Sequence, residues 1–542
     1  MSDEIRGSSV LWFRHGLRFH DNPALHAAIQ ANYNFYPIFI FDGESAGTKV
    51  VGPNRMRFLL ESLKDLDSQL QIVGQRLFVF KGSPVKIFEW MAKSLNMKTL
   101  CFEQDCEPIW AERDNAVKSF CDGAGVKWIE KVSHTLWNPK EVIEANGGVP
   151  PLTYQMFLYT VSTIGNPPRP ETDVDWSKVK FGKLPEDIPD DILLYPGVPT
   201  LEDFNMRAYE GGERMVRWVG GETTAIANLR SRILVEEEAF RCGFYLPNQA
   251  NPDLVAPPTS QSAALRFGCL SVRRFYWTLH DLFNEIHMGK LPSNQNITGQ
   301  LIWREYFYTM SVDNAHYGEM ARNPICLDIP WMPASNANHS HFLLRWKQGM
   351  TGYPFIDAAM RQLLQEGWIH HVARNAVASF LTRGDLWLSW EEGLRHFLEH
   401  LLDADWSVCA GNWMWVSSSA FEQLLDCSHC VCPVNYGRRL DPWGVYVKRY
   451  VPELSQFPVQ FIYEPWKLPL EEQEKYNCVI GRDYPERIVE HKVASQINRK
   501  KMEQIRDSLM NGVPHCCPSN TEEVRQFMWL PDNCSDHVCV PT

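Results

Sequence analysis

The sequence lacks the glycine-rich loops by which many nucleotide-binding α/β domains hold phosphate groups. No G-x-G-x-x-G follows the first predicted strand, which ends in Phe13-Arg14-His15-Gly16-Leu17-Arg18, and no G-x-x-x-x-G-K-[ST] occurs in the 542 residues. A standard dinucleotide or nucleoside triphosphate site in this region therefore has no support.

The chain also lacks a long apolar run, an excess of positive charge and a regular cysteine framework. The early apolar run around residues 35–41 is far too short to cross a bilayer, and the first residues do not have the pattern of a signal peptide. The net charge of −12 gives no support to DNA binding, which requires Lys and Arg to displace phosphate counterions. The 15 scattered cysteines indicate reduced thiols. We therefore expect a protein of the cytoplasm and nucleus with no membrane contact.

What the chain has is length and many aromatic side chains. At 542 residues it exceeds one ordinary core, so two or three domains are expected. Its 20 tryptophans are a surplus, although core packing is the ordinary explanation for any one of them.

Five short β-branched and aromatic runs alternate with helical segments in the first 136 residues. The runs are Ser9–Arg14, Tyr36–Asp42, Arg76–Lys81, Thr99–Gln104 and Val126–Val132. Between the second and third runs, four leucines recur at helical spacing and predict one buried helix face: Leu59, Leu63, Leu66 and Leu70. After the third run, Ser83 is the expected N-cap and Pro84 the first residue of a helix. The alternation predicts an open, doubly wound parallel sheet.

Changes in proline content and in hydrophobic periodicity divide the rest of the chain into three segments. Prolines punctuate residues 137–220, which have little periodicity and predict an interdomain connector. Residues 221–510 have the pattern of a large all-α domain, and residues 511–542 form a C-terminal tail. Together with an α/β domain over residues 1–136, these are the four expected segments.

Hydroxyl groups precede one of the predicted helices. Ser260 and Ser262 lie just before an apolar-periodic stretch, where hydroxyls and free N–H groups can hold a phosphate. The same residue types cap helices generally, so the pattern alone leaves both interpretations open.

Two further segments place polar residues in apolar surroundings. His371, Arg374 and Asn375 share one helix face, and we expect a buried histidine there that needs an anion or acceptor nearby. Asp403 and Asp405 flank one small residue and need cationic partners, for which Arg374 is a candidate. Neither acid has further ligands at the usual spacing, so no metal site is expected.

Several long motifs resemble one family. "LWFRHGLRFHDNPAL", "TGQLIWREYFY", "GWIHHVARN" and "DADWSVCAGNWMW" occur in the order found in the photolyase/cryptochrome superfamily, and the resemblance runs from about residue 8 to 510. Among its members the chain is most similar to the insect-type (type I) cryptochromes, which are circadian blue-light photoreceptors. The resemblance implies a U-shaped FAD held among the helices of the second domain.

The resemblance also implies the residues that hold this FAD. By motif match they are Arg232, Ser260, Ser262, Gln300, His371, Arg374, Asp403, Asp405 and Cys409. Ser260 and Ser262 would bind phosphate, although the family's usual run T-S-x-[LM]-S departs here to Thr259-Ser260-Gln261-Ser262 after Pro258. Arg374 would pair with Asp403 beside the isoalloxazine, and Cys409 would lie near its N5 atom.

The same resemblance gives the tryptophans a function. Excited flavin is a strong oxidant, and closely spaced indoles can refill the hole by electron hops, while the protein supplies the geometry. The chain matches the family at Trp413, Trp390 and Trp331, with Trp387 as an outer fourth member.

Three residues distinguish the functions that share this scaffold. Cyclobutane-dimer photolyases typically carry Glu at the position of Gln300, and (6-4) photolyases carry a second His at Asn375 as an acid/base partner. Photolyases and vertebrate-type repressors usually have Asn at Cys409. A photoreceptor without repair activity is therefore expected, with DNA photolyase and a light-independent clock repressor as the alternatives.

The tail supplies the expected output. Val524, Phe527 and Met528 share one helical face, and the family docks an F-F-W triplet that here reads Phe527-Met528-Trp529. Reduction of FAD would favour protonation or movement of His371 and release the tail. By resemblance the partners are a Timeless-type clock protein and a ubiquitin-ligase F-box adaptor. An antenna pigment of folate or deazaflavin type, or its absence, is left open.

One cluster stands apart from these predictions. Cys427, His429, Cys430 and Cys432 lie within six residues and resemble half of a zinc site. No second half occurs at standard spacing, so the pattern favours a loop of reduced thiols.

Overall fold

The computed structural model describes residues 7–44, 49–207, 217–241, 253–254, 260–288, 297–421 and 430–510. The chain divides into two compact units that interleave in sequence. Unit 1 comprises Met1–Ala315, Leu363–Trp368 and Phe397–Val408, and unit 2 comprises His316–Gln362, Ile369–His396 and Cys409–Thr542. The predicted boundaries at residues 136, 220 and 510 stay predictions. No helix within the described ranges is long and apolar enough to cross a membrane.

Unit 1 contains the predicted doubly wound sheet. Its order is β5-β4-β1-β2-β3-β6, and the first five of these strands run parallel. The strands are β1 (Ser8–Phe13), β2 (Asn34–Phe41), β3 (Phe78–Lys81), β4 (Met97–Glu103), β5 (Lys127–Lys131) and β6 (Leu193–Leu194). All five predicted strands are confirmed. The sixth, which was not predicted, comes from the proline-rich connector and pairs antiparallel with β3.

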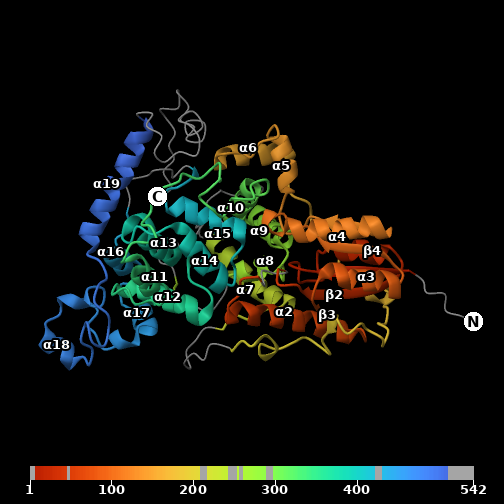
Figure 1. The fold of residues 1–542 in the computed structure, drawn as a ribbon, viewed down its shortest axis with the longest axis horizontal. Helices are drawn as coiled ribbons and strands as arrows, with labels where there is room; N and C mark the ends of the chain where they lie inside the picture. Colours follow the sequence, from red (N-terminus) through yellow and green to blue (C-terminus); the bar gives the residue numbers. More distant parts are fainter. Residues whose placement is uncertain are drawn as a thin grey trace, which may run out of the picture. The chain divides into compact units, whose positions relative to one another are not determined.

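Helices cover both faces of the sheet because the strands alternate their side chains. In β1, Leu11 and Phe13 join one buried core with α1 (Pro23–Gln30) and α2 (Pro53–Ile72). The intervening Val10 and Trp12 join a second core with α3 (Pro84–Ser94) and α4 (Ala111–Ala124). Figure 1 shows α2, α3 and α4 beside the strands.

The predicted helix signals in this unit are largely confirmed. The leucine face of α2 is fully buried at Leu59, Leu63, Leu66 and Leu70. Ser83 is the N-cap of α3 and Pro84 its first residue, but the Ser83 hydroxyl makes no capping hydrogen bond.

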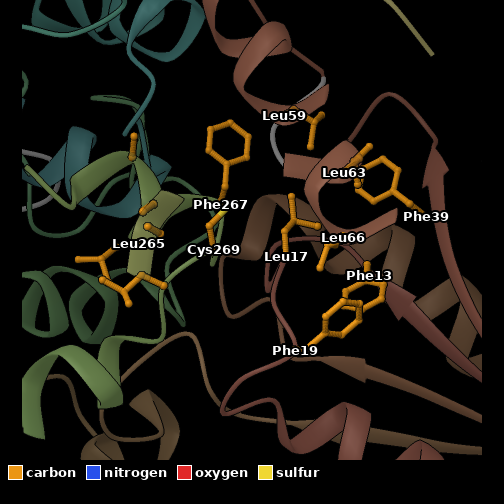
Figure 2. Close-up of a cluster of buried hydrophobic side chains, with 14 of the residues drawn as sticks. Phe13, Leu17, Phe19, Phe39, Leu59, Leu63, Leu66, Leu265, Phe267 and Cys269 are labelled. Atoms are coloured by element: carbon orange, nitrogen blue, oxygen red, sulfur yellow. The ribbon is translucent and has the colours of Figure 1, made fainter. Parts of the chain in front are cut away.

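The first sheet core continues into the helical part of unit 1. Figure 2 shows Leu17 and Leu66 between Phe13 on one side and Phe267 and Cys269 on the other, and these residues belong to one buried cluster. Gly268 makes this contact possible, because a β-carbon there would lie 2.6 Å from the Gly16 backbone. Unit 1 also contains α5 (Pro139–Ala145), α6 (Tyr154–Ile164), α7 (Glu222–Arg241), α8 (Ser262–Arg266), α9 (Val272–His287) and α10 (Ile297–Ser311).

Unit 2 is helical. It contains α11 (His339–Lys347), α13 (His371–Ser379), the π-helical turn η5 (Phe380–Gly384), α16 (Pro433–Leu440), α17 (Val445–Tyr450), α18 (Leu470–Lys475) and α19 (His491–Met510). Three helices pass from one unit to the other along the chain: α12 (Pro354–Glu366), α14 (Trp390–His400) and α15 (Trp406–Val416). A parallel α/β sheet with a helical domain matches the predicted fold class, and the predicted tail lies outside the described residues.

Candidate cofactor site

In unit 1, the segment with the two predicted aspartates is fixed through its backbone. The buried Arg55 guanidinium donates to the carbonyls of Leu398 and Leu401, both at 3.1 Å, and to Ala404 at 3.0 Å. Arg266 donates to the same Ala404 carbonyl at 3.0 Å. The turn that carries Asp403 and Asp405 is therefore held by cationic donors as well as by chain connectivity.

Asp405 belongs to a buried network of charges. Its Oδ1 lies 3.1 Å from Arg266 Nε and 3.8 Å from His134 Nε2, and its Oδ2 lies 3.9 Å from Arg304 Nε. Burial alone would raise the pKa of Asp405, but Arg266, His134 and Arg304 hold it well below its ordinary value. The sequence predicted that this acid needs a cation. Its partners were missed because they lie 101 to 271 residues away.

His134 is kept neutral in this network. Burial, with Arg304 and His15 nearby, lowers the pKa of His134 to about 4. Its Nε2 lies 2.9 Å from Arg304 Nη2 and 2.8 Å from the Tyr308 hydroxyl. A neutral ring with an unprotonated Nε2 can accept the hydrogen bond from Arg304, whereas an imidazolium would face that guanidinium.

The same region contains three groups spaced like metal ligands. Ligand atoms of His15, Glu103 and His134 lie within 4.8 Å of one another. Arg18 Nη2 lies 3.4 Å from Glu103 Oε1, and Arg304 already donates to His134. A metal ion would compete with both guanidinium groups, so we assign no metal to this cluster.

Two serine hydroxyls are brought together at the beginning of α8. Ser260 Oγ lies 3.0 Å from Ser262 Oγ and accepts from the Ser262 N–H at 3.3 Å. Arg232 lies on α7, half-buried, and its Nε donates to Glu236 at 2.7 Å. Adjacent hydroxyls and an arginine within one unit are suitable donors for a diphosphate. Gln300 lies exposed on α10.

In unit 2, the predicted histidine and arginine lie at the beginning of α13. His370 caps the helix by accepting from the Val372 N–H, and Arg374 Nε donates to the Ile369 carbonyl at 2.9 Å. His371 is exposed, which corrects the expectation of a buried ring, and its Nε2 lies 3.4 Å from Asn375 Nδ2. Arg374 and Asp403 belong to different units, so their predicted pairing stays a prediction.

The predicted tryptophans and Cys409 are buried parts of unit 2. Trp390, Trp413, Trp387 and Trp331 are at most 7% exposed, and Cys409 lies on α15 with Trp413. The rings of Trp331 and Trp387 are 4.8 Å apart between centroids. The sequence did not single out Trp346, a fully buried indole whose ring lies 6.2 Å from that of Trp413.

The outer pair of tryptophans lines a surface cavity. This cavity has a volume of about 400 Å³, and Trp331, Trp387 and Lys501 are among its lining residues. Trp387 has φ +56°, a left-handed conformation that is strained for a bulky residue. Its Nε1 donates to the Pro330 carbonyl at 2.9 Å, and its own carbonyl accepts from the Met332 N–H at 2.9 Å. These contacts fix the indole beside Trp331.

Comparison with known proteins identifies the family. The pattern for the FAD binding domain of DNA photolyase matches residues 297–504, and the DNA photolyase pattern matches residues 9–173. Cryptochrome-1 of Anopheles gambiae is 56% identical over 97% of this chain and 98% of that protein. Cryptochrome-1 of Drosophila melanogaster is 55% identical over 97% and 99%, respectively. This chain belongs to the photolyase/cryptochrome family.

Vertebrate and bacterial members of the photolyase/cryptochrome family are also similar. Cryptochrome-1 of Rattus norvegicus is 45% identical over 95% of this chain and 86% of that protein. The crystal structure of Synechocystis sp. PCC6803 cryptochrome superposes with a TM-score of 0.75, covering 91% of this chain and 99% of the other at 23% identity. That likeness shows the fold, and membership with its FAD-binding domain makes FAD the cofactor. The assignment of individual site residues stays a prediction.

Proposed function

We propose that this chain is a blue-light photoreceptor in which light drives electrons along Trp413, Trp390, Trp331 and Trp387. Similarity to insect cryptochromes along nearly the whole chain supports the photoreceptor role. The observation that carries the electron path is the contact between Trp331 and Trp387 at the wall of the cavity. An electron path needs an outermost member near solvent, and this pair provides one.

The cofactor supplies the chemistry that side chains lack: FAD absorbs blue light and, once excited, takes an electron from a nearby donor. The protein contributes position and protection from water. Trp413 would lose the first electron, and Trp390 and then the outer pair would refill it. Because all four rings are largely buried, bulk water has little access to the inner ones.

The output would pass through His371 and the tail. His371 is exposed at the beginning of α13, and an imidazole is the side chain that most readily takes up a proton near neutral pH. We propose that this change releases the tail helix with Phe527, Met528 and Trp529, which lies outside the described residues. The freed surface would bind clock proteins, a Timeless-type protein and an F-box adaptor by family resemblance, in the cytoplasm or nucleus.

Gln300, Asn375 and Cys409 favour this function over DNA repair. An exposed amide at Gln300 cannot hold a lesion as a carboxylate would, and Asn375 cannot act as an acid. DNA photolyase is the second candidate, because both matching family patterns are named for it. A light-independent repressor is the third.

An absorption spectrum of the chain purified in darkness, followed under blue light, tests the proposal. Oxidised flavin that bleaches under light, with no repair of thymine dimers, is the expected result. Repair activity would favour the photolyase, and a chain without flavin would favour the repressor. Deletion of residues 521–542 should then give partner binding in darkness, and light-dependent binding that survives the deletion would contradict tail release.

A further inference from the structure

The surface cavity beside Trp331 and Trp387 has further lining side chains to which the light-driven function gives no role. Its volume is about 400 Å³, and its walls come from three parts of unit 2. They are the segment 330–336, Trp387 after η5, and α19. The lining residues of α19 recur at i, i+3, i+4 and i+7, so one helix face forms the third wall: Lys501, Gln504, Ile505 and Ser508.

Hydrogen bonds join these three walls. Trp387 is bonded to the first wall through the Pro330 carbonyl and the Met332 N–H. The buried Asn498 of α19 donates through Nδ2 to the carbonyls of Gly384 at 3.4 Å and Asp385 at 3.2 Å, shortly before Trp387. The cavity is therefore formed in advance, and a ligand would lose little free energy in ordering its walls.

The floor of the cavity is apolar and aromatic. Trp331, Trp387 and Ile505 are at most 7% exposed, and the two indole rings lie 4.8 Å apart at an interplanar angle of 55°. Indole faces and edges pack favourably against another aromatic ring. Ligand pockets have volumes of about 300 to 1,000 Å³, so this cavity has room for a small ring compound.

Lys501 gives the cavity a single positive charge. Its Nζ lies 4.5 Å from the Trp387 ring centroid and donates to Asn498 Oδ1 at 3.4 Å, and no carboxylate pairs with it in the described part of the chain. The nearby acids of α19 are engaged with arginines, Glu503 with Arg499 at 3.0 Å and Asp507 with Arg506 at 3.9 Å. An ammonium group has three N–H donors, so one remains for an anion.

The same surroundings favour an anion of one charge only. Burial lowers the pKa of Lys501, which reflects a cation partly removed from water, and one carboxylate would balance it. Ser508 lies in the last turn of α19, where the carbonyl end of the helix disfavours further negative charge. The remaining polar groups, Gln504 and Ser508, are neutral. A polyphosphate does not fit this pattern, whereas an aromatic monocarboxylate does.

We propose that this cavity binds a small aromatic carboxylate, with its ring against Trp331 and Trp387 and its carboxylate on Lys501. The bound anion would neutralise Lys501 and so make Trp387 easier to oxidise. Binding in darkness does not depend on the electron path. Only the effect on Trp387 rests on the proposed function.

Titration of the full-length, flavin-loaded chain with 6-fluoro-2-naphthoate in darkness tests the site. The ¹⁹F line width should show saturable binding with a Kd on the order of 0.1 mM. Lys501→Gln should weaken binding about tenfold, the contribution of one charge-assisted hydrogen bond, and Lys501→Arg should retain it. Lys500→Gln is the matched control, because Lys500 is exposed on the same helix and does not line the cavity.

Two further variants of the experiment test the place and the chemistry of binding. Ser508→Trp fills the cavity while it keeps Lys501, and it should abolish binding, with flavin absorbance as the folding check. The neutral analogue 2-naphthylmethanol should compete at least tenfold less well than 2-naphthoate. Absence of saturable binding, equal affinity in wild type and Lys501→Gln, or equal competition by the alcohol would each overturn the proposal. Tighter binding of a short acidic peptide that contains tryptophan would also overturn it, in favour of a protein partner.

Blue light separates this proposal from the electron path. Saturating 2-naphthoate should lengthen the lifetime of oxidised tryptophan in wild type and leave it unchanged in Lys501→Gln. Binding without any change in that lifetime would support the site and count against Trp387 as an electron carrier.

Discussion

The indole of Trp413 packs directly on Gly393, one helix against another within unit 2. A β-carbon at Gly393 would lie 2.1 Å from Trp413 Cη2 and 2.5 Å from Cζ2. Gly393 lies in α14 three residues after Trp390, so the spacing of two proposed electron carriers depends on the absence of a side chain.

Gly393→Ala should therefore displace the Trp413 ring. Overpacking of this kind costs about 1 to 3 kcal/mol of unfolding free energy, and a shifted ring should slow the photoreduction of FAD. Chemical denaturation and the initial rate of flavin bleaching measure the two effects. Gly123→Ala, in a helix where nothing lies within 4 Å of the added carbon, is the matched control. An unchanged bleaching rate in Gly393→Ala would argue against Trp413 as the first donor.

Lys501 should restrain the oxidation of the outermost indole. Its Nζ lies 4.5 Å from the Trp387 ring centroid, and a positive charge there opposes a second one on the ring by at most about 4 kcal/mol at an effective dielectric constant of 20. Lys501→Gln should increase the yield and lifetime of oxidised tryptophan in transient absorption. Lys501→Arg keeps the charge and should resemble wild type. If both variants give the same yield and lifetime of oxidised tryptophan, the charge of Lys501 does not control the oxidation of Trp387.

Arg55 should be required both for stability and for retention of FAD. Arg55→Leu leaves the carbonyls of Leu398, Leu401 and Ala404 without this donor, and the loss of charged hydrogen bonds in a buried site costs about 2 to 4 kcal/mol. Urea denaturation and the ratio of flavin to protein test the expectation. Arg55→Lys keeps the positive charge but loses the forked set of N–H donors. Its unfolding free energy and its flavin content should lie between those of wild type and Arg55→Leu. A stable chain that retains its flavin would show that the turn holds without Arg55.

His134 should make the folded state sensitive to mild acid. Burial and its cationic neighbours lower the pKa of His134 to about 4, whereas an unfolded chain has the ordinary value of about 6.5. The stability that the neutral ring contributes is therefore present above pH 6.5 and is lost as the pH falls towards 4. In that window wild type should lose roughly 1.4 kcal/mol per pH unit more than His134→Gln, as measured by denaturation at several pH values. Parallel slopes would contradict a neutral buried His134.

The sheet was predictable and the site only in part, for physical reasons. Runs such as Tyr36–Asp42 are short, apolar and rich in β-branched and aromatic residues, and their alternation with helical segments predicts buried parallel strands. The two-residue strand β6 is too short to have a sequence pattern of its own. Leu193–Leu194 is a strand only because it pairs with β3. Local sequence patterns predict local secondary structure, but they do not identify which distant segments of the chain come into contact.

Asp405 and His371 show the same limit within the site. The sequence indicated that Asp405 needs a cation, but only the fold brings Arg266 to it, 139 residues earlier in the chain. The helical spacing of His371 and Asn375 was right, yet periodicity could not tell that the His371 ring is exposed. The resemblance to a family supplied what spacing could not, namely the cofactor.

The short strand β6 has a consequence for handling this protein. β3 would otherwise present an unpaired row of N–H and C=O groups, whereas β5 at the opposite edge carries Lys127, Glu130 and Lys131. Proteolytic nicking or tag insertion near Leu193–Leu194 would uncover the β3 edge. The expected result is intermolecular strand pairing and aggregation, even in a chain whose flavin chemistry is intact.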